Sequence, residues 1–180
     1  GSGDSSSTRA VFGGGLTPSE TNVIDYVTIA SVGDAADFGD LVIAMRAASC
    51  GSNSIRQVFA GGYAGDATGN INVIQYITIA STGDTTDFGD LTGATRGTAG
   101  TSNGHGGLDF ETVQRPSVTY MPGSGRALFG GGLAGSNVST LDQTTIQTLG
   151  NASDFGELTQ ARNSPRGVGD YRYNNLFFIR

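Results

Sequence analysis

The stretch Asn22-Val-Ile-Asp-Tyr-Val-Thr-Ile29, together with Asp37-Phe-Gly-Asp-Leu41 a few residues later, decides the fold of this chain. β-branched and aromatic residues dominate the first segment, which predicts a β-strand. Because apolar residues alternate onto both of its faces, we expect this strand to be covered on both sides. The turn residues Gly33-Asp34 lead into the second segment, which predicts a short strand with Phe38 and Leu41 directed inward.

The same pattern occurs three times along the chain. The apolar strand returns at residues 72–79 and 141–146, and the Asp-Phe-Gly-Asp/Glu-Leu segment returns at residues 87–91 and 154–158. Each copy opens with Arg-x-Val/Leu-Phe and a run of small residues, starting at Arg9, Arg56 and Arg126. The glycines in that run permit a tight reversal. A repeat of roughly 40 to 50 residues is typical of a four-stranded propeller blade.

The repeats divide the chain into five parts. We predict an N-terminal extension (1–8), a first repeat (9–55), a second repeat (56–125) with an insertion at about 97–125, a third repeat (126–164) and a partial fourth repeat or closing strand (165–180). Each full repeat is expected to end with a strand of small residues, such as residues 47–53. Gly1-Ser2-Gly3 is left outside the predicted fold.

Composition excludes several classes of protein. The 180 residues include 30 glycines, one cysteine and ten basic residues, all of them arginine, and the net charge is −6. A single cysteine excludes an intrachain disulfide. An acidic chain without lysine lacks the basic stripe that nucleic acids require, so we expect no nucleic-acid partner. We also expect no membrane span, because no apolar run approaches the necessary length.

Taken together, these motifs resemble the kelch repeat. A glycine pair closes one strand, a tyrosine-bearing strand follows, and then come an aromatic-x-x-Leu segment and an arginine. Kelch sequences usually carry tryptophan as that aromatic residue, whereas this chain has Phe38, Phe88 and Phe155. The segment Ile-Asp-Tyr-Val-Thr-Ile-Ala-Ser is similar to segments of kelch-like repeat proteins of tailed bacteriophages. The resemblance implies an all-β propeller that serves as a non-enzymatic structural component of the virion: a decoration, fibre or tail-associated protein.

Three repeats and a fragment leave two blade faces uncovered, and uncovered strands favour self-association. We expect the propeller to be completed by oligomerisation, with a dimer favoured. Two chains would then close a six-bladed ring, using residues 175–180 as a strand donated across the seam. The alternatives are packing against other virion proteins and a compact monomer.

Acidic residues recur at the turn of each repeat. Spacings of three residues bring the carboxylates close enough together that they could coordinate Ca²⁺. The alternative, which we favour, is that these side chains cap turns by accepting hydrogen bonds from nearby backbone N–H groups. We therefore predict no metal and no cofactor. The residues concerned are Asp34, Asp37, Asp40, Asp84, Asp87 and Asp90.

Three arginines, Arg46, Arg96 and Arg162, each follow the leucine of the third strand. We expect them to occupy equivalent places and to pair with the repeated aspartates; the alternative is a ring that binds an anionic sugar or carboxylate. Cys50 lies in the small-residue segment, where we predict a buried apolar filler.

The insertion is the one interruption of the repeat, and binding residues concentrate on loops held by a rigid scaffold. Its chemistry-bearing residues form a candidate contact surface for a glycan or a protein; the alternative is a tolerated insertion. This surface supports a second function, a host-surface glycan-binding adhesin module. No nucleophile signature accompanies the lone histidine, so we predict no enzyme. The surface comprises His105, Asp109, Phe110, Glu111, Arg115 and Tyr120.

Overall fold

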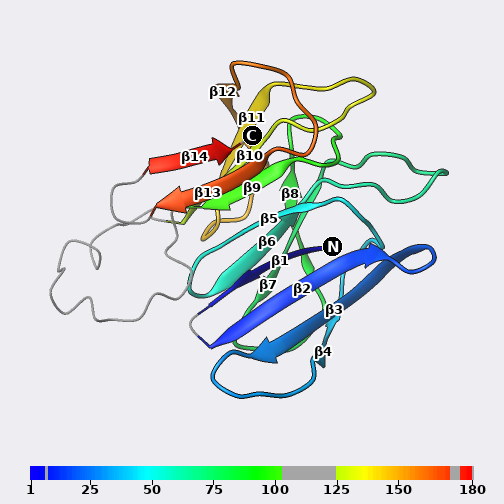
Figure 1. Cartoon of the computed structure of the whole chain (residues 1–180), viewed down its shortest axis with the longest axis vertical. Helices are drawn as coiled ribbons and strands as arrows, with labels where there is room; N and C mark the ends of the chain where they lie inside the picture. The colour runs from blue at the N-terminus through cyan, green and yellow to red at the C-terminus, as the bar shows by residue number, and fades with distance from the viewer. Residues whose placement is uncertain (7, 103–124, 171–174, 180) are drawn as a thin grey trace, which may run out of the picture.

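The computed structural model describes residues 1–6, 8–102, 125–170 and 175–179. In these residues the chain is all-β, with three four-stranded antiparallel sheets and one two-stranded sheet (Figure 1). The all-β, propeller-like class predicted from the repeats is confirmed, and the sheets do not close into a ring. The described part contains no helix long and apolar enough to cross a membrane.

Each four-stranded sheet is a blade whose strands follow in chain order. The first blade contains β1 (Ser2–Ser5), β2 (Arg9–Leu16), β3 (Glu20–Thr28) and β4 (Ala36–Asp40). The second contains β5 (Ser49–Ser52), β6 (Arg56–Ala60), β7 (Val73–Thr78) and β8 (Thr86–Asp90). The third contains β9 (Ala99–Ser102), β10 (Arg126–Gly130), β11 (Thr140–Thr145) and β12 (Ser153–Glu157). The half-blade consists of β13 (Arg166–Asp170) and β14 (Asn175–Ile179).

Sheet boundaries fall one strand earlier than the repeat boundaries. The small-residue strand β5 pairs with β6, with Ser49 opposite Ala60, so it opens the second blade instead of ending the first. The turn between them explains this pairing, because Asn53 Oδ1 accepts hydrogen bonds from the N–H groups of Ile55 and Arg56. By the same rule β1 belongs to the first blade, although residues 1–8 look like an extension in the sequence. The fourth repeat likewise contributes two strands.

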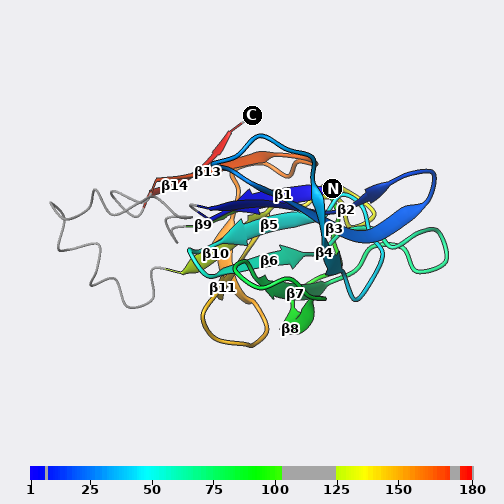
Figure 2. The same ribbon diagram turned by 90° about the horizontal axis from the view of Figure 1, so that it is seen from below.

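The small-residue strands lie next to one another on the inner side of the molecule, where β1 contacts β5, β5 contacts β9 and β9 contacts β13 (Figures 1 and 2). The backbones approach too closely here for large side chains. A Cβ on Gly100 would collide with the carbonyl oxygen of Cys50, and a Cβ on Gly51 would lie 3.1 Å from Ala127 Cβ. Close approach is therefore the physical reason for the small residues.

Two hydrophobic cores lie between consecutive blades. We call the side of a blade that faces the next blade its forward face, and the opposite side its backward face. The first core joins the forward face of the first blade to the backward face of the second. It contains Val11, Ile24, Phe38, Leu41, Met45, Phe59, Ile71, Ile77 and Ile79. The second core repeats this arrangement one blade later, with Val58, Ala60, Ile74, Phe88, Leu91, Ala127, Phe129 and Ile146. The prediction that Phe38 and Leu41 point inward is confirmed.

Arginines at the start of the second strand tie neighbouring blades together. Arg9 lies 4.6 Å from the ring centre of Tyr26 and donates a hydrogen bond of 3.0 Å to the carbonyl of Ile79 in the next blade. Arg56 lies 4.8 Å from Tyr76 and donates to the carbonyl of Ile146, again one blade further on. These contacts give a structural role to an arginine that the sequence marks only as the start of each repeat.

Candidate functional site

The joint between the first two blades is held by a fixed set of hydrogen bonds. The N–H groups of Gly83 and Thr85 donate to the carbonyls of Phe38 and Asp40, at 2.7 and 2.8 Å. In return, Asp84 Oδ1 accepts from the N–H of Asp40 at 3.0 Å. The Gly-Asp turn of one blade therefore binds the outer strand of the blade before it.

The second joint repeats these bonds at equivalent positions. Gly150 and Ala152 donate to the carbonyls of Phe88 and Asp90, at 2.9 and 2.7 Å. Asn151 Oδ1 takes the place of the aspartate oxygen and accepts from the N–H of Asp90 at 3.1 Å. Because an amide oxygen performs the same task, this position requires an acceptor and not a negative charge.

These bonds account for part of the repeated acidic cluster. Asp84 caps a backbone N–H, although that N–H belongs to the preceding blade and not to its own turn. Within the described ranges, no three residues among His, Cys, Asp and Glu are grouped so that they could hold a metal ion. The six aspartates considered for Ca²⁺ thus have no metal-binding geometry to support that alternative.

A glycine in each outer strand allows the blades to meet. Gly39 and Gly89 have φ values of 144° and 146°, which disfavour any side chain. A Cβ on either residue would lie 2.5 Å from the carbonyl oxygen of Gly83 or Gly150 in the next blade. Gly156 has the same conformation, at 145°, but among the described residues no atom outside its immediate neighbours lies within 4 Å of its Cβ position. The third blade is therefore shaped for a neighbouring turn that no described residue provides.

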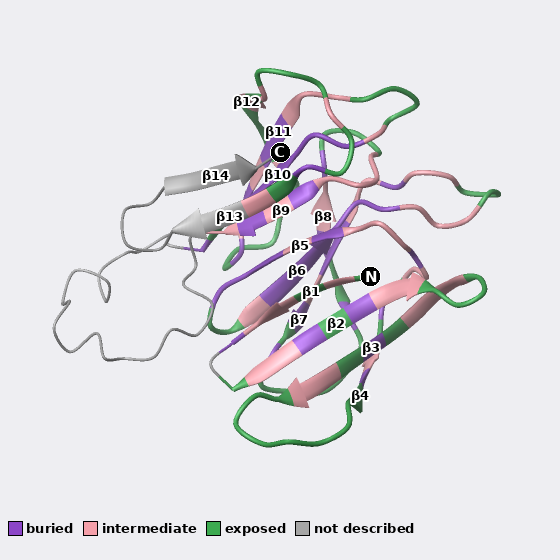
Figure 3. Ribbon diagram, viewed as in Figure 1, coloured by how far each residue is buried: buried purple, intermediate pink, exposed green. Residues whose placement is uncertain are grey.

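The first blade carries the complementary uncovered surface, visible as exposed parts of β2 and β3 in Figure 3. Phe12 is 52% exposed, whereas Phe59, at the equivalent position, is fully buried. Ile29 is also 52% exposed, against 1% for its counterpart Ile79. We call this surface the open backward face; it also includes Val23.

The third blade carries the opposite surface on its outer strand. Phe155 is 49% exposed, whereas Phe38 and Phe88 are both 3% exposed. We call the surface formed by Phe155, Gly156 and Glu157 the open forward face. Each open face therefore carries, at matching positions, one side of the joint that the chain already forms twice internally.

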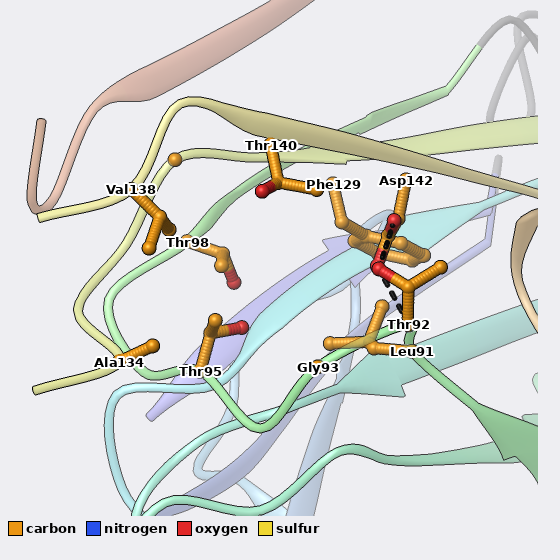
Figure 4. A pocket seen from close by; sticks show the side chains of 11 residues that line it. Leu91, Thr92, Gly93, Thr95, Thr98, Phe129, Ala134, Val138, Thr140 and Asp142 are labelled. Atoms are coloured by element: carbon orange, nitrogen blue, oxygen red, sulfur yellow. Dashed lines mark hydrogen bonds between the residues drawn. The ribbon is translucent and has the colours of Figure 1, made fainter. Parts of the chain in front are cut away.

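A pocket lies at the second joint, and its lining differs from the same place in the first. The cavity measures about 240 Å³ and is bordered by Thr92, Thr95, Thr98, Phe129, Thr140 and Asp142 among others. In Figure 4, Thr95 and Thr98 lie across the cavity from Thr92 and Asp142, which are hydrogen-bonded to each other. Asp142 is buried; its carboxylate accepts from Thr92 N–H at 2.9 Å and from Thr92 Oγ1 at 2.7 Å.

The pocket exists because two large side chains are missing at the second joint. At the first joint, Ile43 and Met45 fill the corresponding space, and Met45 Sδ lies 3.7 Å from Gln75 Nε2. Their counterparts, which follow Leu91 at the same spacing, are Gly93 and Thr95. The cavity is therefore a local departure from the repeat, and its lining combines four threonines and Asp142 with apolar side chains.

Replacing Thr95 with methionine is expected to stabilise the protein. The new side chain would fill the cavity as Met45 does, and we expect the free energy of unfolding to rise by about 1 kcal/mol. Urea denaturation followed by circular dichroism measures the change. Thr82→Met is the control, because Thr82 is exposed and its substitution should leave the midpoint unaltered. A destabilised Thr95→Met variant would contradict this account of the pocket.

Two of the three arginines that follow the third strand enclose one tyrosine. Arg46 and Arg96 lie 4.8 and 4.7 Å from the ring centre of Tyr63. Arg46 also forms an ion pair of 3.3 Å with Glu20, an acid outside the repeated cluster. The Tyr63 hydroxyl donates a hydrogen bond to Asp66, which raises the pKa of the tyrosine.

Arg162 does not occupy the equivalent place, so the prediction of three matching arginines is wrong. Gly62 N–H donates to the carbonyl of Thr95, whereas its counterpart Gly132 donates to the carbonyl of Arg162. Arg162 therefore stands at the position of Thr95 and not at that of Arg96. The cause is the place of the arginine itself: Arg162 follows Leu158 by four residues, as Thr95 follows Leu91, whereas Arg96 follows Leu91 by five.

Cys50 is half-buried on β5, and its thiol donates to the carbonyl of Gly3 at 3.0 Å. Burial, assisted by the negative charge of Asp4, raises the pKa of Cys50 to about 12. The predicted filler role is consistent with this environment, although the residue is not fully covered. A thiol in this state stays protonated throughout the physiological pH range.

We expect Cys50 to resist alkylation. A thiol pKa shifted from 9.0 to about 12 lowers the thiolate fraction at pH 8 roughly a thousand-fold. Iodoacetamide labelling followed by mass spectrometry should therefore be slower than that of free cysteine by about this factor, and full labelling should return in 6 M guanidinium. Labelling of the folded protein at the rate of free cysteine would contradict the expectation.

The candidate contact surface of the insertion lies outside the described residues. This applies to all of its members: His105, Asp109, Phe110, Glu111, Arg115 and Tyr120.

Comparison with the models of known protein families finds no match to the chain. Comparison with curated protein sequences finds none either. The class of the protein is therefore defined by its fold: an all-β chain of propeller-like blades in which the described residues leave one open face at each end of the series.

Proposed function

We propose that the chain is a non-enzymatic structural component of a phage particle, a decoration, fibre or tail-associated protein built from kelch-like blades. The observation that carries this proposal is the pair of open blade faces, which repeat at matching positions what the internal joints bury. The resemblance of the repeats to phage kelch-like proteins supports the phage particle as the place where the protein acts. The chemistry of the described residues is used for holding blades together, which supports a role in assembly.

The energetics of the open faces favour association. Burying one large apolar side chain contributes about 1.5–3 kcal/mol, and Phe12, Ile29 and Phe155 are each about half exposed. Each joint also satisfies backbone groups of an outer strand through the Gly-Asp or Gly-Asn turn of the next blade. A neighbouring molecule that covered these faces would gain both contributions.

The absolute mass of the purified chain, measured by light scattering over a dilution series, tests the assembly role. We expect a dimer or a larger assembly that dissociates on dilution. Phe12→Ser should weaken it, because the substitution removes apolar surface from the open backward face, whereas Val32→Ser is a control at an exposed residue in the loop between β3 and β4. A chain that is monomeric at every concentration, with and without Phe12, would contradict self-assembly.

A host-surface glycan-binding adhesin module is the second candidate, and the pocket at the second joint favours it. Threonine hydroxyls and a buried carboxylate are groups that can hydrogen-bond to sugar hydroxyls. Glycan-array binding of the wild type, of Thr95→Met and of a chain lacking residues 104–125 tests this function. If the protein is an adhesin, one of the two variants loses binding while its mass in solution is unchanged. Absence of binding by the wild type would remove this candidate.

A further inference from the structure

We infer that the outer half of the fourth blade is a docking site for a pair of antiparallel strands supplied by another polypeptide of the same repeat type. The site combines the edge of β14 that pairs with no described strand and the open forward face of the third blade. This inference rests on the proposed assembly function and names the kind of partner that would serve it.

The half-blade already has the register of a blade's inner pair. In β13 and β14, Arg166 lies opposite Ile179, as Ser49 lies opposite Ala60 in the second blade. The half-blade also lies directly against the third blade, because a Cβ on Gly167 would lie 2.9 Å from the carbonyl oxygen of Gly100. The inner half of the fourth blade is therefore complete and occupies its place.

The outer half is missing from the described residues. In every full blade the second strand pairs on its other edge with a third strand, as β6 does with β7. In the described part of the chain β14 pairs with β13 alone. An edge of unpaired N–H and carbonyl groups is a template for a further strand.

The open forward face shows where the missing strands would lie. In the first two blades, the next blade's outer pair covers Phe38 and Phe88, and its Gly-Asp or Gly-Asn turn bonds to that strand's backbone. Phe155 and Gly156 have the same register but no such cover among the described residues. A strand pair that extended the β14 edge would therefore bring its turn onto Gly156.

The partner must be a strand pair and not an intact blade. An intact first blade of a second copy would place its inner strands where β13 already contacts β9. A strand pair has no inner strands, so the half-blade does not obstruct it. The internal joints define its chemistry: an aliphatic strand equivalent to β7, a Gly-Asp turn without a bulky side chain, and an Asp-Phe-Gly strand equivalent to β8.

A fluorescent peptide of residues 71–92, which contains β7 and β8, tests the inference in trans. We expect saturable binding to the full chain by fluorescence polarisation. Phe155→Ser should weaken binding at least tenfold, because it removes the apolar centre of the open forward face. Leu149→Ser is the matched control: Leu149 is an exposed apolar residue like Phe155, but it lies outside β12 and should leave binding within twofold of the wild type.

If the free peptide does not bind because it does not fold, a fusion of the strand pair to the chain tests the same inference. Residues 61–92 are joined directly after Ile179, which has the register of Ala60. We expect amide exchange in β14 to slow at least a hundredfold, and the added segment to resist proteolysis unless Phe155→Ser is present. An added segment that is digested freely, with β14 exchange unchanged, would overturn the inference. Self-association in light scattering would then leave the assembly function standing.

Discussion

Gly89→Ala is expected to lower the free energy of unfolding by about 2 kcal/mol more than Gly156→Ala does. Both glycines have the same φ, so alanine imposes the same backbone strain of about 1–3 kcal/mol at either position. Only at Gly89 does the added Cβ also meet a carbonyl oxygen of the next blade, at 2.5 Å. A forced overlap in a packed interface adds about 1–3 kcal/mol. Urea denaturation of the two variants measures the difference.

Gly39→Ala should behave like Gly89→Ala, because its Cβ would be 2.5 Å from the carbonyl oxygen of Gly83. The three substitutions thus separate conformational strain from the collision between blades. Equal losses at all three positions would show that the joints open easily, and would contradict the close docking of the blades described above.

Phe59→Ala is expected to lower the free energy of unfolding by about 3–5 kcal/mol, whereas Phe12→Ala should cost less than about 1 kcal/mol. Both residues sit at the same position of the repeat. Phe59 is fully buried between the first two blades, while Phe12 is 52% exposed on the open backward face. The measurement is chemical denaturation at a protein concentration low enough to keep the chain monomeric.

Repeating the denaturation of Phe59→Ala and Phe12→Ala at several protein concentrations provides the control. If the open backward face is covered in an assembly, the cost of Phe12→Ala should grow as concentration rises, because association stabilises the folded state by mass action. The loss of unfolding free energy caused by Phe59→Ala should stay the same at every protein concentration. An equal loss for both variants at low concentration would mean that Phe12 is covered within the single chain.

Much of the fold could be predicted from the repeat itself. The β-branched strands, the glycine turns and the inward positions of Phe38 and Leu41 all follow from local residue chemistry. Equivalent residues differ in burial where their neighbours differ. Phe155 has the sequence context of Phe38, yet it is exposed, because the described chain after it forms a two-stranded sheet and not a full blade. The sequence shows a residue's preference for burial but not whether a neighbour is there to bury it.

Other features needed a closer alignment of the copies. Arg162 differs from Arg46 and Arg96 already in the sequence, because it follows its leucine by four residues and they follow theirs by five. The backbone bonds show that this spacing puts it at the position of Thr95. The pocket could have been found in the sequence, since Ile43 and Met45 stand against Gly93 and Thr95. The role of Gly39 could not have been found in the sequence, because a close contact between backbones that are distant along the chain leaves no local sequence pattern.

The offset between repeats and sheets has a consequence for how such a chain can grow or shrink. Each of the first two sequence repeats gives three strands to one sheet and its last strand to the following one. Cutting the chain at a repeat boundary would thus strip a blade of its innermost strand and leave an incomplete sheet. Removing residues 49–98 instead takes out one whole sheet and joins the outer strand of one blade to the inner strand of another. Because both joints place their backbone bonds at equivalent positions, the shortened chain would meet the same bonding pattern at the new junction, so the number of blades can change in whole steps.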